Sequence, residues 1–337
     1  MLHHQHISEF AGLPVVEFPG LDTLDHAPPN PVQPHAVLAA ALEDPGSVAW
    51  RLRMEEPDEE PREDLPAYLE RFVREVPPHT VRALIVGHVP DDYQFMSDEA
   101  RDQVAGLASR LTNLRSLFFA EVVSEESEIS WIEHGDLTPL LAAYPRLTGF
   151  TVRGTDGLGL GVGRHEHLRR LTVQTGGLPG QVARDVAAAD LPALERLELW
   201  LGQEEYGNDT TPEDLAAVLS GDAFPRLRHL GLRNAENADD WARVVAEAPV
   251  VFRLDVLDLS LGSLTDEGAE LLLAAPALHG LQRLDLHHHY LSEETAERLR
   301  TEFTKAGVET DVSDRREPHV FEGSGGVVVS RFPAVGE

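Results

Sequence analysis

Leucines spaced three and then two residues apart recur along the chain and predict a repeated β-strand. In the second half the pattern Leu-x-x-Leu-x-Leu occurs at Leu194-Leu197-Leu199, Leu227-Leu230-Leu232, Leu254-Leu257-Leu259 and Leu281-Leu284-Leu286. Looser copies precede them, at Val81-Leu84-Val86, Leu114-Leu117-Phe119, Leu147-Phe150-Val152 and Leu168-Leu171-Val173. Because strand side chains alternate between two faces, the last two apolar residues of each copy point to the same side.

The length of the repeat predicts a stack of strand-and-helix units. The middle residues of successive copies are 33, 33, 21, 26, 33, 27 and 27 residues apart, a mean of about 29, at the upper end of the leucine-rich repeat range. One unit cannot bury its apolar strand face alone, whereas stacked units bury it against their neighbours. The predicted fold class is therefore an α/β leucine-rich repeat solenoid, a horseshoe with a parallel β-sheet on the concave face and mostly helices on the convex face.

Helices are expected between the strands, and several begin with a capping residue. Thr211, Thr265 and Ser292 are followed by acidic residues that favour a helix start. The glycine-rich stretch 157–163 is too short for a helix and is expected to cross in extended form. The predicted helices span residues 97–111, 138–144, 180–189, 211–219, 239–248, 265–275 and 292–306.

The chain is expected to have three parts. An N-terminal α/β cap covers residues 1–78, and the solenoid of about eight units covers residues 79–312 and ends in a strand at 308–312. A linker and tail cover residues 313–337, with a further strand or an ordered tail at 326–332. Within the cap, strands are expected at 14–18 and 48–54 and helices at 35–42 and 65–76.

One segment carries a family resemblance. Leu257-Asp-Leu-Ser-Leu-Gly-Ser-Leu-Thr-Asp-Glu-Gly-Ala269 resembles the ribonuclease-inhibitor-like type of leucine-rich repeat. The whole chain also resembles an uncharacterised bacterial leucine-rich repeat family, a resemblance that implies a fold and no activity. The asparagine of this repeat type is replaced by Gly202, Ala235, Gly262 and His289. The loop backbone groups that an asparagine would bind therefore need other partners.

Composition narrows the possible functions. Lys and Arg number 28 against 58 Asp and Glu, so the formal net charge is −30. Such a chain repels phosphate backbones, which disfavours nucleic acid and anionic membranes as partners. Cysteine is absent, which excludes disulfides and thiolate sites and suits a reducing compartment. With no signal-peptide pattern and no long apolar run, a cytoplasmic location is expected. The sequence leaves the oligomeric state open.

The favoured functional hypothesis is binding at the predicted concave face. Residues that flank the strand leucines point to this face, and in the second half they are acidic with one tryptophan and one arginine. The expectation is a non-enzymatic scaffold that binds a protein or peptide there, with a basic partner favoured by the net charge. Trp200 and Arg233 are the expected anchors, because these residue types often dominate interfaces. The expected partner-binding residues are Glu198, Trp200, Arg233, Asp258, Asp285 and His287.

A metal-dependent or accessory enzyme is the alternative. Asp258 and Asp285 belong to adjacent predicted strands, and His287 shares the face of Asp285. Carboxylate and imidazole ligands together suit zinc, manganese or iron, so these three residues form the candidate divalent-metal site. The competing interpretation of the run 287–289 is a surface histidine cluster in which His289 replaces the missing asparagine. No catalytic motif is present, so catalytic residues and other cofactors are not expected.

Overall fold

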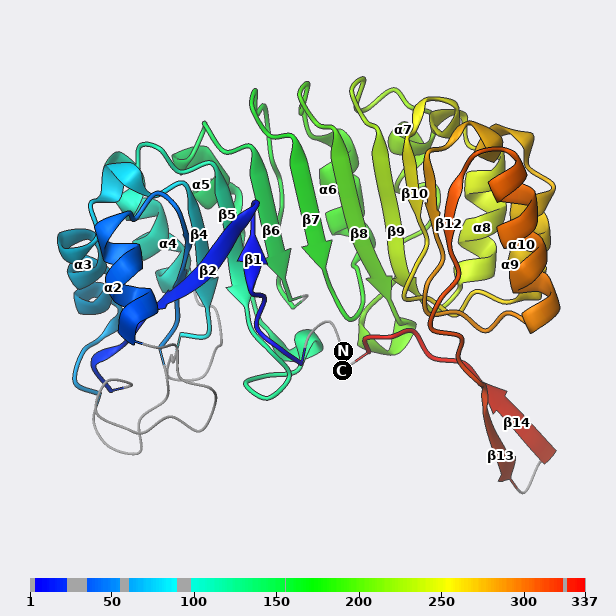
Figure 1. Ribbon diagram of the computed structural model, residues 1–337, viewed down its shortest axis with the longest axis horizontal. Helices are drawn as coiled ribbons and strands as arrows, with labels where there is room; N and C mark the ends of the chain where they lie inside the picture. The colour runs from blue at the N-terminus through cyan, green and yellow to red at the C-terminus, as the bar shows by residue number, and fades with distance from the viewer. Residues whose placement is uncertain are drawn as a thin grey trace. The chain divides into compact units, whose positions relative to one another are not determined.

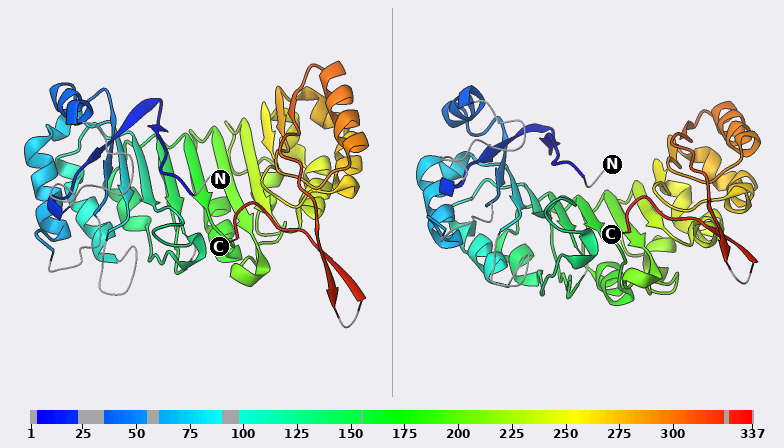
Figure 2. Two further views of the ribbon diagram at one scale, coloured as in Figure 1. Left: turned by 60° about the horizontal axis from the view of Figure 1, so that its bottom comes forward. Right: turned by 90° about the horizontal axis from the view of Figure 1, so that it is seen from below.

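The computed structural model describes residues 4–22, 35–54, 61–89, 98–154, 156–323 and 326–336. The chain divides into two compact units, Met1–Arg170 and Leu171–Glu337. Each unit has its own run of repeats, in which the helices lie on one side of a sheet (Figures 1 and 2). We call the side of the sheet opposite the helices the open face; it corresponds to the predicted concave face.

Among its described residues, the N-terminal unit has six strands arranged in sequence order. The first pair, β1–β2, is antiparallel, and the pairs from β2–β3 to β5–β6 are parallel. The sheet therefore runs without a break from the predicted cap into the first repeats. Its strands are β1 (Glu9–Phe10), β2 (Leu13–Phe18), β3 (Ala49–Leu52), β4 (Ala83–Gly87), β5 (Ser116–Glu121) and β6 (Gly149–Arg153). Its helices are α2 (His35–Glu43), α3 (Leu65–Glu75), α4 (Asp98–Gly106) and α5 (Thr138–Ala143), with 3₁₀ turns η1 (Pro78–Thr80), η2 (Leu107–Ser109) and η3 (Ile129–Trp131).

The C-terminal unit continues the same alternation of strand and helix. Its strands follow sequence order, and the pairs from β8–β9 to β11–β12 are parallel. They are β7 (Arg170–Gln174), β8 (Arg196–Gly202), β9 (His229–Ala235), β10 (Val256–Asp258), β11 (Arg283–Asp285) and β12 (Glu309–Asp311). The helices are α6 (Gly180–Ala188), α7 (Ala216–Leu219), α8 (Ala238–Glu247), α9 (Asp266–Leu273) and α10 (Glu293–Lys305), with 3₁₀ turns η4 (Glu204–Tyr206), η5 (Pro249–Arg253) and η6 (Pro276–Gly280).

The repeated leucines form the core of the C-terminal unit. Leu230 is paired in register with Leu197 on one side and Leu257 on the other, and Leu257 with Leu284. All four side chains are fully buried, and burial of each stabilises the fold by roughly 1.5–3 kcal/mol. The predicted consecutive rungs, and with them the predicted leucine-rich repeat fold class, are confirmed.

Local capping explains where the helices begin. The hydroxyl of Thr265 accepts a hydrogen bond from the backbone N–H of Glu267, and Ser292 caps α10 in the same way. The helix expected at 211–219 is shorter than predicted, because α7 covers only Ala216–Leu219. Residues 212–216 instead form tight turns whose backbone bonds join residues three apart, such as that from the N–H of Leu215 to the carbonyl of Pro212.

The N-terminal segment covers part of the open face of its own unit. The carboxylate of Glu121 on β5 accepts bonds from the backbone N–H of Ile7 (2.8 Å) and from the guanidinium of Arg51 (2.8 Å). His6 contacts the same carboxylate at 2.9 Å, and the ring of Phe10 lies 6.0 Å from that of Phe118. Figure 1 shows β1 in front of the strands accordingly.

Residues 313–337, expected to be a linker and tail, contain a hairpin. β13 (His319–Gly323) pairs antiparallel with β14 (Gly326–Ser330) and forms a separate two-stranded sheet. Its apolar side chains are exposed, including Val320 at 62% and Phe321 at 54%. No helix in the described part of the chain is long and apolar enough to cross a membrane.

Candidate binding surface on the sheet of the C-terminal unit

The strand register brings carboxylates into one row across the open face. Glu198 is paired with Gly231, which is paired with Asp258, and Asp258 is paired in turn with Asp285. The row ends at Asp311 on β12. Glu198, Asp258 and Asp285 each follow a fully buried leucine, so alternation turns them away from the helices. We call Glu198, Asp258, Asp285 and Asp311 the acidic row.

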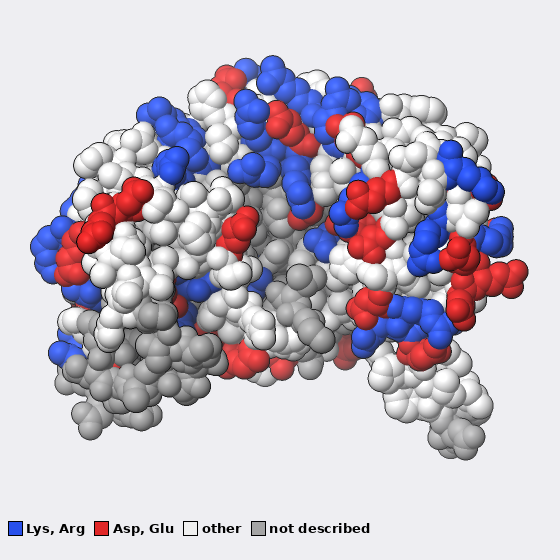
Figure 3. All heavy atoms as spheres, viewed as in Figure 1, with Lys and Arg blue, Asp and Glu red and all other residues white. Residues whose placement is uncertain are grey.

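Basic residues lie on both sides of the acidic row. Two positions earlier along the strands, Arg196 forms an ion pair with Glu198, and Arg283 lies 2.9 Å from Asp285. His229 contacts Glu198 from the neighbouring strand at 3.1 Å. Two positions later, His287 contacts Asp285 at 2.6 Å. Figure 3 shows that both signs of charge are interleaved on this part of the surface.

Arg233 occupies the centre of the arrangement. Its Nε lies 3.2 Å from Asp258 and donates a hydrogen bond to the hydroxyl of Ser260 at 3.0 Å. Its Nη1 lies 3.9 Å from Glu198. The guanidinium also lies over the ring of Trp200, 5.6 Å from the centroid, where a cation–π contact is favourable. Arg233 therefore bridges two strands and two members of the acidic row.

The environment keeps two of the buried acids, Glu198 and Asp285, ionised. Burial by itself raises the pKa of Glu198, but the hydrogen bond from His229 and the charges of Arg233 and Arg196 lower this pKa to about 2. Burial likewise raises the pKa of Asp285, and the ring and backbone N–H of His287 outweigh it, again lowering the pKa to about 2. The hydrogen bond to Asp285 raises the pKa of the His287 imidazole, against the effect of burial.

The six predicted binding residues fall on this one surface, but four of them are buried. Glu198, Asp258 and Asp285 are 5%, 5% and 7% exposed. Trp200 is only 2% exposed, and its indole N–H is buried with no hydrogen-bond partner among the residues that the structure describes. The Trp200 ring therefore packs beneath the guanidinium of Arg233 and is not exposed as the predicted interface anchor. The sequence interpretation missed Arg196, His229 and Arg283. Each lies two residues before a position of the row on its strand, so the alternation of strand side chains places it on the same face.

The predicted metal ligands divide between two clusters. Within the described ranges, Asp258 groups with Glu198 and His229, whereas Asp285 and His287 group with Asp311. In each cluster the ligand atoms lie within 4.8 Å of one another. Arg233 reaches into the first cluster and Arg283 into the second. These guanidinium groups supply the positive charge that a divalent cation would otherwise bring.

The other two histidines of the run 287–289 have structural contacts. His289 is fully buried; its Nε2 contacts the carbonyl oxygen of Val312 at 3.1 Å and its Nδ1 accepts from the N–H of Leu291 at 3.1 Å. It thus performs the loop-bridging role of the missing asparagine. His288 has a left-handed backbone and its ring lies 3.4 Å from Asp314, so it turns away from Asp285.

At two of the other loop positions without asparagine, Gly202 and Ala235, the backbone itself supplies the partner. The N–H of Ser263 donates to the carbonyl of Ala235, and the N–H of Glu236 donates to that of Gly202. Each bond joins one repeat to the next. The expectation that these groups need other partners is met by the neighbouring repeat itself.

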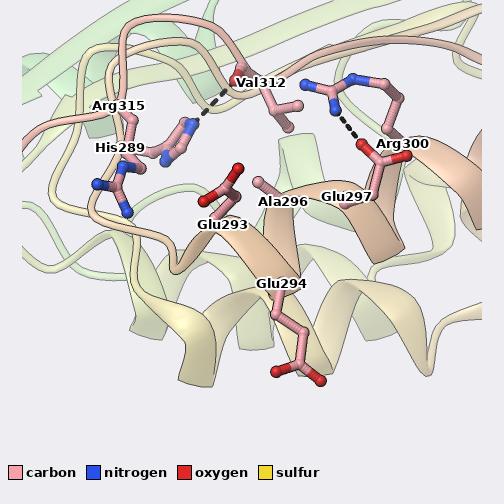
Figure 4. Close-up of a pocket in the computed structure, with 8 residues that line it drawn as sticks. All are labelled: His289, Glu293, Glu294, Ala296, Glu297, Arg300, Val312 and Arg315. Atoms are coloured by element: carbon pink, nitrogen blue, oxygen red, sulfur yellow. Dashed lines mark hydrogen bonds and ion pairs between the residues drawn. The ribbon is translucent and has the colours of Figure 1, made fainter.

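A groove of about 730 Å³ lies between α10 and the end of β12 (Figure 4). Both ring nitrogens of its buried histidine, His289, are already hydrogen-bonded, and Arg300 pairs with Glu297. Arg315 pairs with Glu317, which lies outside the lining, so the cationic groups of the groove already have partners. Its lining residues are His289, Glu293, Glu294, Ala296, Glu297, Arg300, Val312 and Arg315.

Comparison with other proteins finds a solved structure with a similar overall fold. No protein-family model matches the sequence, and no curated protein matches it either. The crystal structure of a Bacteroides fragilis protein, a structural genomics target, is similar at 31% identity and a TM-score of 0.70, over 74% of this chain and 70% of that one. An internalin from Listeria monocytogenes aligns at 15% identity and a TM-score of 0.31, over 82% of this chain and 63% of its own. At this identity and coverage, the chain belongs to the same protein family as the Bacteroides fragilis protein.

Proposed function

We propose that this protein is a non-enzymatic scaffold that binds a protein or peptide on the open face of its C-terminal unit. The observation that carries the proposal is the acidic row, which places four carboxylates from four strands on one line. Solenoids use extended sheet faces of this kind for binding. The rigid strands hold the polar groups in place before a partner arrives, which lowers the entropic cost of binding.

The charge of the chain favours a basic partner. A net charge of −30 attracts cationic partners from a distance and accelerates encounter at low salt. At the surface, Asp311 and Glu309 at the edge of the sheet remain accessible, with side chains 33% and 71% exposed. A partner's arginine or lysine reaches these edge carboxylates first and then competes with Arg283 for Asp285.

A charge-matched pair of variants tests the site. The double variant Asp285→Asn/Asp311→Asn removes two carboxylates from the acidic row. The control Asp240→Asn/Glu247→Gln removes two exposed carboxylates from α8, on the helical side. Binding of a fluorescent octalysine peptide is measured by anisotropy at low and high salt.

The proposal expects about a tenfold loss of affinity for the row variant, equivalent to one ion-paired contact. The control should change affinity less than twofold. Binding should also weaken as salt is raised. Equal effects of the two variants would mean that the peptide senses only the overall charge, and the assignment to this face would be abandoned.

A further inference from the structure

The segment that follows the hairpin lies on the C-terminal unit like a bound peptide. Residues 331–336 run past the carboxyl ends of the strands (Figure 1). Burial alternates along the segment: Phe332 is 44% exposed, Pro333 is buried, Ala334 is partly exposed and Val335 is 1% exposed. This period of two is the pattern of an extended peptide with one side against a protein surface.

The backbone of the segment is held at three points. The side-chain amide of Asn234 donates to the carbonyl of Val335 at 2.6 Å and accepts from its N–H at 3.0 Å. The N–H of Ala334 donates to the carbonyl of Leu261 at 2.7 Å. The hydroxyl of Tyr290 donates to the carbonyl of Phe332 and accepts from its N–H, at 2.9 and 3.0 Å. All of these hydrogen bonds are made to backbone groups of the segment, so they do not require one particular amino-acid sequence.

Two of the residues that hold the segment, Asn234 and Leu261, occupy equivalent corners of successive repeats. His288, whose Nε2 lies 3.4 Å from the carbonyl oxygen of Phe332, occupies the next corner, two residues before Tyr290. Asn234, Leu261 and His288 all have left-handed backbones, with φ of 58°, 67° and 60°. Such a conformation costs energy for residues other than glycine. Here it turns the ends of three strands in the same way, so that the side chain of Asn234 and the carbonyl of Leu261 face one line. We call Asn234, Leu261 and Tyr290 the tail-binding surface.

The need of Asn234 for a partner is the strongest indication of a built site. The residue is 0% exposed, and both ends of its amide are hydrogen-bonded to Val335. Removal of the segment would take away the partners of both ends of this amide at once. The surface is thus complementary to one extended peptide unit.

The hairpin adds little to this attachment. Its described apolar side chains, among them Val328 at 55% and Val329 at 48%, remain exposed. The segment is therefore retained by its own contacts and by its covalent tether.

We propose that the tail-binding surface is a peptide-binding site, which residues 331–336 occupy in cis and which accepts an extended peptide of the same kind in trans. The peptide class is uncharged at its centre, with an apolar residue at the position of Val335 and a small residue at that of Ala334. This site lies at the strand ends, apart from the acidic row, and the described residues hold the segment by hydrogen bonds and apolar contacts. This peptide-binding site is independent of the proposed binding of a basic partner to the acidic row, and a negative result for the acidic row would leave it untouched.

The test uses the full chain and a fluorescent peptide that copies residues 330–336. The substitution Val335→Asp places a charge in a buried position and weakens the cis segment. A tether raises the local concentration of the cis segment to the millimolar range, so the unaltered chain should bind the peptide at least tenfold more weakly than the Val335→Asp variant. Adding Asn234→Ala should abolish the trans binding, whereas Asn113→Ala, an exposed asparagine of the N-terminal unit, should not.

Hydrogen exchange at the amides of Ala334 and Val335 reports whether the segment has left the surface. Both amides should exchange faster in the Val335→Asp variant and in Asn234→Ala alone. The proposal is overturned if exchange rises and the peptide still does not bind, which would make the segment a fixed part of the fold. It is equally overturned if exchange is unchanged in Asn234→Ala, or if the peptide binds regardless of Asn234.

Discussion

Arg233 lies over the ring of Trp200, and the same guanidinium is 3.2 Å from the carboxylate of Asp258. One arginine thus joins an aromatic support on β8 to the acidic row on β10. Asp258 is only 5% exposed, so this group compensates a buried charge. The same guanidinium also contributes to the neutralisation of Glu198, beside Arg196 and His229. Breaking a buried pair by removing one partner is much more costly than losing an exposed one.

Replacing Arg233 should therefore destabilise the fold. Arg233→Ala is expected to lower the free energy of unfolding by about 3 kcal/mol in urea titrations. Arg243→Ala, which removes a half-exposed guanidinium paired with Asp240 and Glu267 on the helical side, should cost less than about 0.5 kcal/mol. If the two variants unfold at the same urea concentration, the central arginine has no special structural role.

The pH dependence of the same variants provides a second check. Since the pKa of Glu198 is about 2 in the folded chain and higher when unfolded, its contribution to stability is present above pH ~4.5 and is lost as the pH falls toward 2. Without Arg233, one of the charges that lower this pKa is gone. In folded Arg233→Ala the pKa of Glu198 should therefore lie closer to its unfolded value, and the stability lost between pH ~4.5 and 2 should be smaller than in the unaltered chain.

The fold was predictable because it depends on a short-range pattern repeated many times. Leu197, Leu230, Leu257 and Leu284 are spaced by the repeat, and stacking is the one way in which each can be buried. Alternation along a strand also predicted that Asp285 and His287 share a face. The helix at 211–219 was over-predicted, because a capping pattern fits a tight turn as well as a helix.

The parts that sequence could not provide depend on contacts between distant residues. The amide of Asn234 meets Val335, 101 positions later in the chain, and no periodicity links them. The pairing of Arg233 with two acids likewise depends on side-chain reach across strands. Proximity of Asp258 and Asp285 in adjacent strands was correctly expected, but the competing arginines that divide them between two clusters were not.

The N-terminal segment should make stability sensitive to alkaline pH. His6 lies 2.9 Å from Glu121 and 3.4 Å from Glu126. Burial opposes its protonation, but these two acids outweigh burial and raise its pKa to about 9. A raised pKa means that the contribution is complete below pH 6.5 and is lost between pH 6.5 and about 9.

Thermal unfolding between pH 6 and 10 tests this expectation. The unaltered chain should lose about 1–2 kcal/mol across the interval, a value reduced for partial exposure. His6→Ala should flatten the curve, whereas His79→Ala, which removes an exposed imidazole, should leave its shape unchanged. A curve of the same slope in all three proteins would contradict the proposed role of His6.

His289 should behave as a structural residue. His289→Ala removes the ring that bridges Leu291 and Val312 and should cost about 2–3 kcal/mol of unfolding free energy. His289→Asn should recover part of this loss, because an amide also offers a donor and an acceptor. The exposed His319 serves as a control, since His319→Ala is expected to change stability by less than about 0.5 kcal/mol. No recovery by asparagine would argue against the loop-bridging role.

Substitution by alanine should destabilise the fold to different extents at two glycines near the end of β8. Gly202 and Gly207 both have left-handed backbones, with φ of 75° and 95°, so alanine strains each by roughly 1–2 kcal/mol. At Gly202 the new Cβ would also collide with the backbone carbonyl of Gly176, whereas nothing lies within 4 Å of the Cβ at Gly207. Gly202→Ala should therefore lower the midpoint of thermal unfolding much more than Gly207→Ala. Equal midpoints would mean that the segment around Gly176 does not pack against β8 as closely as the structure indicates.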